Sequence, residues 1–101
     1  MIKLLVKACK LSDIDNIFSI DIDDKKIMLI RKDDKIYALD RICTHQYADL
    51  SNGFITDDTI TCPLHLAQFE ITSGKAVSPP AEEPLKLYNI KIEGDDIYVE
   101  I

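Results

Sequence analysis

The sequence is poor in several residue types, and each shortage excludes a class of protein. Of its 101 residues, two are histidines, three are cysteines, three are glycines and none is tryptophan. No uninterrupted apolar run is long enough to span a bilayer, and Lys3 and Lys7 interrupt the N-terminal apolar stretch before a secretion signal can form. Basic residues are outnumbered, 12 against 18 acidic ones, which gives a net charge of -6. Such a surface repels nucleic acid and anionic membranes and favours a partner with a basic patch.

The length and composition are those of one globular domain. The 47% hydrophobic and 30% charged fractions are too apolar for a disordered chain, and 101 residues leave no room for a second catalytic domain. Two cysteines belong to the motif described below, so Cys9 alone remains and forms no internal disulfide. We therefore expect Cys9 to be a small buried apolar residue and the protein to reside in the reducing cytoplasm.

The hydrophobic pattern predicts an all-β fold. Apolar and polar residues alternate over 18–22 and 97–101, the period of half-buried strands. Short β-branched or aromatic runs at 27–30, 36–39, 59–61 and 88–92 are separated by polar breaks. The only candidate helical turn is 12–16.

Paired aspartates occupy the breaks between apolar runs: Asp23-Asp24, Asp33-Asp34, Asp57-Asp58 and Gly94-Asp95-Asp96. Asp side chains can cap their own backbone in tight turns, so these pairs predict hairpins. A calcium site is the alternative, but no EF-hand spacing surrounds any pair.

Both histidines and two cysteines form one motif. Cys43-Thr44-His45 is followed, after sixteen residues, by Cys62-Pro63-Leu64-His65. Two thiols and two imidazoles in matched short pairs suit either structural zinc or a [2Fe-2S] cluster with histidines on one iron. The ligand types interleave within a β domain, whereas zinc modules usually place their histidines adjacent in sequence, so the cluster is favoured over zinc.

This C-x-H and C-x-x-H spacing resembles the Rieske iron-sulfur family. The resemblance covers roughly 43–80 and implies one Rieske domain over 1–101: an antiparallel β sandwich or barrel (about 1–40 and 85–101) with an inserted cluster-binding lobe (about 41–84). It assigns Cys43 and Cys62 to the inner iron and His45 and His65 to the outer iron of one [2Fe-2S] cluster. Ser78-Pro79-Pro80-Ala81 resembles the family's proline loop, which covers the cluster. Leu50 resembles a leucine that packs beneath the cluster in the family. Leu66 departs from the family's usual glycine.

Two positions beside the second pair predict a low midpoint potential. High-potential relatives carry a serine and a tyrosine whose hydroxyls donate hydrogen bonds to cluster and cysteine sulfurs, and this chain has Ala67 and Phe69 instead. Hydrogen bonds to sulfur favour the reduced state, so their loss lowers the potential within the Rieske window of about -150 to +300 mV.

The resemblance implies an electron carrier rather than an enzyme. A terminal oxygenase needs further histidines for a second iron, and none remains. A respiratory subunit needs a membrane anchor and a second cysteine in each ligand loop. We therefore expect a soluble ferredoxin that passes electrons from a flavin-dependent NAD(P)H reductase to a terminal oxygenase. The alternatives are an electron-relay subunit of an NAD(P)H nitrite reductase and a non-catalytic redox-sensing module.

Overall fold

Short antiparallel strands make up most of the fold. The computed structural model describes residues 4–44, 48–63, 67–78 and 83–101. Within these residues the strands form three sheets, one of three strands and two of four. The elements in chain order are β1 (Leu5–Lys10), η1 (Leu11–Asp13), β2 (Ile17–Ile22), β3 (Lys25–Lys32), β4 (Lys35–Asp40), η2 (Leu50–Asn52), β5 (Phe54–Thr56), β6 (Thr59–Thr61), β7 (Gln68–Glu70), β8 (Ala76–Ser78), β9 (Leu87–Tyr88), β10 (Ile90–Glu93) and β11 (Asp96–Glu100). The predicted all-β class is confirmed.

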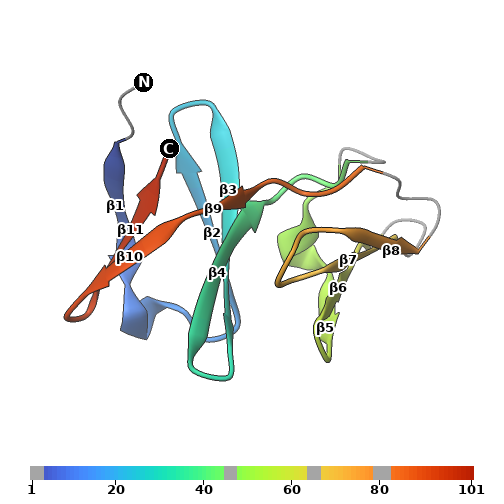
Figure 1. Ribbon diagram of the computed structural model, residues 1–101, viewed down its shortest axis with the longest axis horizontal. Coiled ribbons are helices and arrows are strands. Elements are labelled where there is room, and N and C mark those ends of the chain that lie inside the picture. The colour runs from blue at the N-terminus through green and yellow to red at the C-terminus, as the bar shows by residue number, and fades with distance from the viewer. Residues whose placement is uncertain (1–3, 45–47, 64–66, 79–82) are drawn as a thin grey trace.

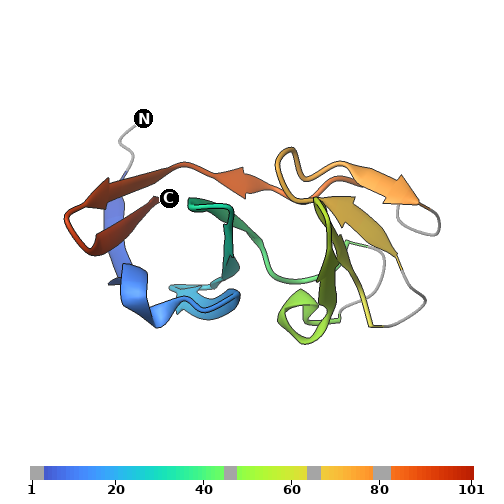
Figure 2. The ribbon, with the colours of Figure 1, turned by 90° about the horizontal axis from the view of Figure 1, so that it is seen from below.

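Two of the sheets, β1-β11-β10 and β2-β3-β4-β9, form what we call the base of the molecule (Figure 1). Figure 2 shows them enclosing a common interior. The side chains buried there are Cys9, Ile14, Ile22, Ile27, Leu29, Ile36, Ala38, Ile97 and Val99. Cys9 is 8% exposed, which confirms that it is a buried apolar residue.

The third sheet, β5-β6-β7-β8, lies beside the base and, with η2 and the segments that carry Cys43 and Cys62, forms what we call the lobe (Figure 1). In the sequence it falls between β4 and β9, and these two strands pair through Ala38 with Tyr88 and Leu39 with Leu87. The chain therefore leaves the base and returns beside its point of departure. This confirms the predicted architecture, in which a small lobe is inserted into an antiparallel β domain; the bounds at 41 and 84 stay a prediction.

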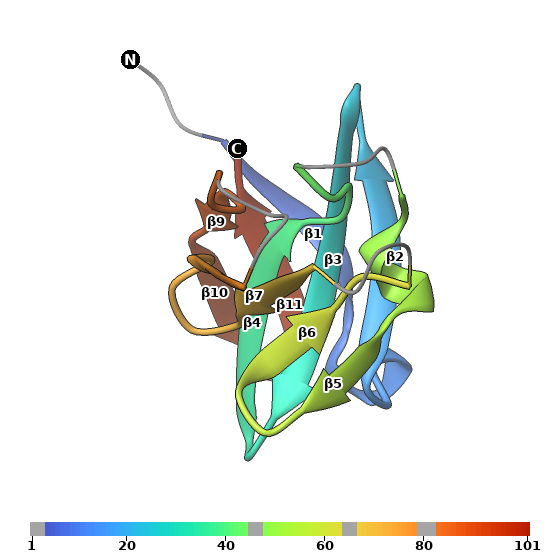
Figure 3. The same cartoon turned by 90° about the vertical axis from the view of Figure 1, so that its right-hand side faces the viewer.

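Strand β3 contributes to the cores on both of its faces. Ile27 and Leu29 point into the interior of the base, whereas Met28 and Ile30 belong to a second core shared with the lobe. Side chains alternate between the faces of a strand, so an uninterrupted apolar run is what a strand buried on both sides requires. Figure 3 shows the lobe in front of this strand.

Three of the aspartate pairs form hairpin turns, and the fourth turn is Gly94-Asp95, because Asp96 already belongs to β11. Asp23, Asp33, Asp34 and Asp57 have φ of 55°, 50°, 66° and 52°, and Gly94 has φ of 60°. Asp and Gly are among the few residues that adopt this left-handed region readily. The hairpin prediction is therefore confirmed.

Several local predictions needed adjustment. The helical turn is η1 (Leu11–Asp13), which starts one residue and ends three residues earlier than expected. The predicted strand 88–92 is divided at Asn89 into β9 and β10, which belong to different sheets. Strands β1, β5, β7 and β8 were not among the predicted runs. The last three have three residues each, too few to establish a period of two. Strand β6 is equally short, and its β-branched residues Thr59, Ile60 and Thr61 predicted it.

Candidate metal centre

The two cysteines of the motif lie at the ends of strands and point into one core. Cys43 follows the end of β4 by three residues, and Cys62 comes directly after β6. They are 2% and 0% exposed and belong to the same apolar cluster between the lobe and the base. His45 and His65 lie outside the described residues. The structure thus brings the two predicted thiol ligands to a common core, while the four-residue ligand set stays a prediction.

The segments that begin at the two cysteines are closed in the same way. The backbone N–H of Cys43 donates to the carbonyl oxygen of Ala48 at 2.9 Å, and that of Cys62 donates to Ala67 at 2.7 Å. In both cases the acceptor comes five residues after the cysteine, and the segment in between contains one histidine of the motif. The spacings C-x-H and C-x-x-H differ, but both are set in segments of equal length with the same closing hydrogen bond.

Apolar side chains surround the cysteines. Leu50, Ala67 and Phe69 are all fully buried and share the core of Cys43 and Cys62. Leu50 therefore has the core position predicted for it. Neither Ala67 nor Phe69 has a side-chain hydrogen-bond donor, and both stand inside the core that contains the thiols.

Buried thiols in apolar surroundings fit a metal-centre interpretation. Such surroundings raise the free energy of a bare thiolate, whereas a metal ion stabilises it outright. Two thiolates on a [2Fe-2S] core of charge +2 give a neutral centre, which an apolar core can accommodate. Zinc with two thiolates is neutral as well, so burial does not distinguish the two metals. Within the described residues no group of three His, Cys, Asp or Glu side chains forms a metal site.

The segment after the predicted covering loop contacts the first ligand segment. The hydroxyl of Thr44, which lies between Cys43 and His45, donates to the carbonyl oxygen of Glu83 at 2.8 Å. Residues 79–82 are outside the described part of the chain, as is Leu66. The covering role of the proline loop and the effect of Leu66 both stay predictions.

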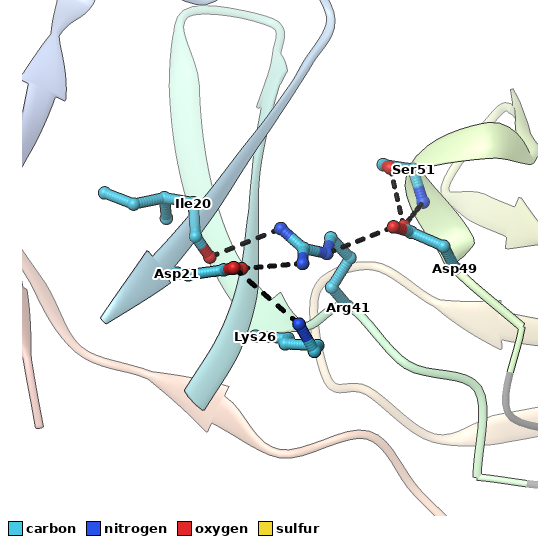
Figure 4. Close-up of polar contacts among 6 residues, drawn as sticks. All are labelled: Ile20, Asp21, Lys26, Arg41, Asp49 and Ser51. Atoms are coloured by element: carbon cyan, nitrogen blue, oxygen red, sulfur yellow. Dashed lines mark hydrogen bonds and ion pairs between the residues drawn. The ribbon is translucent and has the colours of Figure 1, made fainter. Parts of the chain in front are cut away.

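A buried arginine lies just before the first cysteine. Nη2 of Arg41 donates to Oδ1 of Asp21 at the end of β2, 2.7 Å away (Figure 4). This hydrogen bond, together with the charges of Arg41 and Lys26, holds the pKa of Asp21 below its usual value. The sequence analysis did not single out Arg41; its one signal was a charged residue between the apolar end of β4 and Cys43.

A surface pocket of about 420 Å³ adjoins the end of β4 and contains neither cysteine. It is lined by Asp24, Lys25, Lys26, Asp40, Ile42, Lys86 and Tyr88. Two of the lining residues are hydrogen-bonded to each other: the Tyr88 hydroxyl donates to Oδ1 of Asp40 at 2.6 Å. Burial, and then this bond to a carboxylate, raise the pKa of Tyr88 above its usual value. The pocket is therefore separate from the candidate metal centre.

Described residues contain no helix with the length and apolar character needed to cross a membrane.

Comparison with known proteins agrees with this geometry. Residues 4–89 match the model of the Rieske [2Fe-2S] domain. The chain is 35% identical to the 3-phenylpropionate/cinnamic acid dioxygenase ferredoxin subunit of Escherichia coli over 98 residues, 95% of this chain and 92% of that protein. It is 33% identical to the ferredoxin component of the naphthalene 1,2-dioxygenase system of Pseudomonas putida, also over 98 residues, 95% of this chain and 94% of that one.

Solved structures of similar fold include ferredoxins, and also nitrite reductase small subunits and terminal oxygenases below 25% identity. The ferredoxin of carbazole 1,9a-dioxygenase from Nocardioides aromaticivorans superposes with a TM-score of 0.88 at 27% identity, covering 94% of this chain and 95% of that one. A chain in the complex of reduced oxygenase and oxidised ferredoxin of carbazole 1,9a-dioxygenase gives a TM-score of 0.88 at 30% identity, with 94% and 91% covered. The matched family model spans most of the chain, including both cysteine and histidine pairs, and the protein therefore belongs to the Rieske [2Fe-2S] domain family.

Proposed function

We propose that this protein is a one-electron carrier that holds one [2Fe-2S] cluster on Cys43, His45, Cys62 and His65. The observation that carries the proposal is the pair of buried cysteines in one core, each opening a segment that contains a histidine and is closed by the same hydrogen bond. When bound, such a cluster takes up and releases single electrons. The described protein residues bury the thiol ligands in an apolar core.

The electron donor is a flavin-dependent NAD(P)H reductase and the acceptor is a terminal oxygenase. The support is that the relatives at 35% and 33% identity are both ferredoxin parts of dioxygenase systems, and that a similar chain was solved in complex with its oxygenase. These matches favour an oxygenase over a nitrite reductase as the partner. On this proposal the chain carries electrons, works in the cytoplasm and is not itself catalytic.

Acidic residues on the lobe support docking by electrostatic attraction. Among the described residues of the lobe, Asp57, Asp58 and Glu83 are exposed, and the whole chain has a net charge of -6. A basic patch on the partner would be attracted to this surface, with fast and salt-sensitive association. Raising the salt concentration should therefore slow reduction by the reductase and leave the midpoint potential nearly unchanged. A rate that does not respond to salt would contradict this mode of docking.

Metal content is the first test of the proposal. Purified protein should be reddish brown and contain two irons and two acid-labile sulfides per chain. Replacing Cys43 or Cys62 by serine should abolish the colour, whereas Cys9→Ser, which changes the cysteine outside the motif, should leave it intact. A colourless protein with one zinc would refute the cluster.

Turnover with candidate partners tests the electron path. The protein should be reduced by NAD(P)H in the presence of a flavin-dependent reductase, and the reduced form should support product formation by a terminal oxygenase. Transfer to a sirohaem nitrite reductase would favour the relay-subunit alternative. Absence of transfer to either class would favour the redox-sensing alternative.

A further inference from the structure

Arg41 joins the base of the molecule to the lobe through its side chain (Figure 4). Its side chain is 9% exposed, and the guanidinium lies between two carboxylates: Nη2 is 2.7 Å from Oδ1 of Asp21, and Nε is 3.3 Å from Oδ2 of Asp49. Nη1 also donates to the carbonyl oxygen of Ile20 at 3.4 Å. Asp21 is the penultimate residue of β2 in the base, whereas Asp49 precedes η2 in the lobe. One buried cation therefore contacts both parts of the chain.

The backbone of Arg41 makes a second connection at the same place. Its N–H donates to the carbonyl oxygen of Lys26 at 2.9 Å, and its carbonyl oxygen accepts from the N–H of Leu50 at 2.7 Å. Ile42 and Asp49 form an isolated antiparallel bridge. Arg41 and its neighbour thus hold the two ends of the segment that starts at Cys43 and closes at Ala48.

Asp49 is itself fixed in place. Its Oδ1 accepts from the backbone N–H of Ser51 at 2.9 Å and from the Ser51 hydroxyl at 2.6 Å. Its other oxygen faces Nε of Arg41 at ion-pair distance, yet this buried Nε makes no hydrogen bond within the described residues. The contact between Arg41 and Asp49 is therefore one of charge more than of directed hydrogen bonding.

We propose that Arg41 is a positioning residue that orients Cys43 relative to the base, retains the cluster and tunes its midpoint potential together with Asp21 and Asp49. The inference rests on the proposed function, because it assumes a cluster on Cys43. Arg41 and Ile42 hold the two ends of the ligand segment, and Arg41 carries a buried charge two positions before Cys43. Groups that orient metal ligands contribute to metal retention although they never touch the metal.

The charges of Arg41 and Asp49 should affect the midpoint potential in a way that a purely structural role would not. Reduction adds one negative charge to the centre. Arg41→Met removes the cation and leaves two carboxylates, so the reduced state is disfavoured and the midpoint potential falls. Asp49→Asn removes one carboxylate and keeps the cation, so the midpoint potential rises. If Arg41 and Asp49 only positioned the ligand segment, there would be no reason for the two variants to shift the midpoint potential in opposite directions.

Lys32→Met is the matched control, because Lys32 also connects the base to the lobe. Its Nζ lies 3.4 Å from Oδ1 of Asp58 and donates to the carbonyl oxygen of Asp57. These aspartates form the turn between β5 and β6, at the end of β6 opposite Cys62. Lys32→Met breaks a contact between base and lobe without touching a ligand segment.

The experiment measures cluster release to a chelator, midpoint potential and amide hydrogen exchange over 41–50 for the holoprotein and its variants. Arg41→Met is expected to release the cluster about tenfold faster or more, the range found for other residues that orient metal ligands, with faster exchange at Cys43 and Leu50. Arg41→Lys keeps the positive charge but lacks the planar guanidinium that contacts both carboxylates. Its midpoint potential should therefore lie close to that of the wild type, whereas its cluster-release rate should stay closer to that of Arg41→Met. Lys32→Met should change neither the potential nor the release rate.

The proposal would be overturned if Arg41→Met and Lys32→Met had equal effects on the cluster-release rate and the midpoint potential. It would also be overturned if Arg41→Met and Asp49→Asn shifted the midpoint potential in the same direction. If Arg41→Met does not fold, Asp49→Asn carries the test, and an unchanged or lowered potential overturns it. A wild-type protein that holds zinc instead of the cluster would refute the proposed function. Amide exchange over 41–50 would then still report whether Arg41 orders the segment.

Discussion

Thr44 and Glu83 are joined by a hydrogen bond although 39 positions separate them in the sequence. The Thr44 side chain donates to the backbone of Glu83, so the bond connects the first ligand segment to the residue that follows 79–82. A loop that covers the cluster, as predicted for the prolines, would be anchored at this end by Thr44.

Thr44→Val should remove this anchor while preserving the shape of the side chain. An exposed hydrogen bond contributes about 0.5–1 kcal/mol, so air oxidation and chelators should bleach the cluster about two- to fivefold faster. Loss of visible absorbance with time measures the effect. Thr44→Ser keeps the hydroxyl and should behave like the wild type; a Thr44→Val protein as slow as Thr44→Ser would contradict the anchoring role.

Ala67→Ser should raise the midpoint potential. It introduces a donor into the fully buried core of the cysteines, and a hydrogen bond to sulfur that strengthens by about 1 kcal/mol on reduction corresponds to about 40 mV for one electron. Phe69→Tyr should act in the same direction. A redox titration followed by visible absorbance measures both. Ala76→Ser, at a partly buried site packed against the same core, is the control and should leave the potential unchanged.

Gly53→Ala should destabilise the lobe. A Cβ at this position would lie 2.1 Å from the carbonyl oxygen of Thr61, which immediately precedes Cys62. Backbone atoms must move to relieve such an overlap, at a cost of about 1–3 kcal/mol. Urea unfolding of the apoprotein measures this loss. At Gly94 an added Cβ meets nothing within 4 Å, but φ is +60°, so Gly94→Ala should lose only the backbone preference, about 1 kcal/mol. A smaller loss at Gly53 than at Gly94 would contradict the steric explanation.

Asp34→Gly should stabilise the β3–β4 hairpin. Asp33 and Asp34 both have positive φ, as a type I′ turn requires, and glycine adopts that conformation without strain. The expected gain is about 0.5 kcal/mol, since relief of strain exceeds the extra entropy of the unfolded chain. Thermal unfolding measures it. Asp24, in the preceding hairpin, is not among the described residues with positive φ, so Asp24→Gly should be destabilising.

Tyr88→Phe should lower stability by about 1 kcal/mol near neutral pH, because the hydrogen bond to Asp40 is lost. The pKa of Tyr88 is raised in the folded protein by burial and by Asp40. Its contribution is therefore complete below the unfolded pKa of about 10 and is lost as pH rises from there towards the folded value. Free energies of unfolding for wild type and Tyr88→Phe between pH 7 and pH 11 should converge at the alkaline end. A difference that does not change with pH would contradict the raised pKa.

Local patterns accounted for the fold class and for most of the longer strands, although β1 was not predicted. Alternation over 18–22 and 97–101 predicted β2 and β11 to within one residue, and the aspartate pairs marked hairpin turns, because both signals depend on neighbours in sequence. The three-residue strands β5, β7 and β8 were not predicted, because three residues are too few to show a period of two. Strand β5 pairs with β6, and β7 pairs with β6 and β8, so their positions depend on pairing within the lobe.

The amino-acid sequence was sufficient to predict Cys43, His45, Cys62 and His65 as ligands, because the prediction uses only residue type and spacing along the chain. It could not point to Arg41, Asp21 and Asp49 as a unit, since 20 positions separate Arg41 from Asp21 and their contact exists only after β2, β4 and the lobe have packed. The common core of Cys43 and Cys62 likewise depends on β3 being buried on both faces. Metal-binding chemistry is local in sequence; the surroundings that orient and tune it are made by long-range packing.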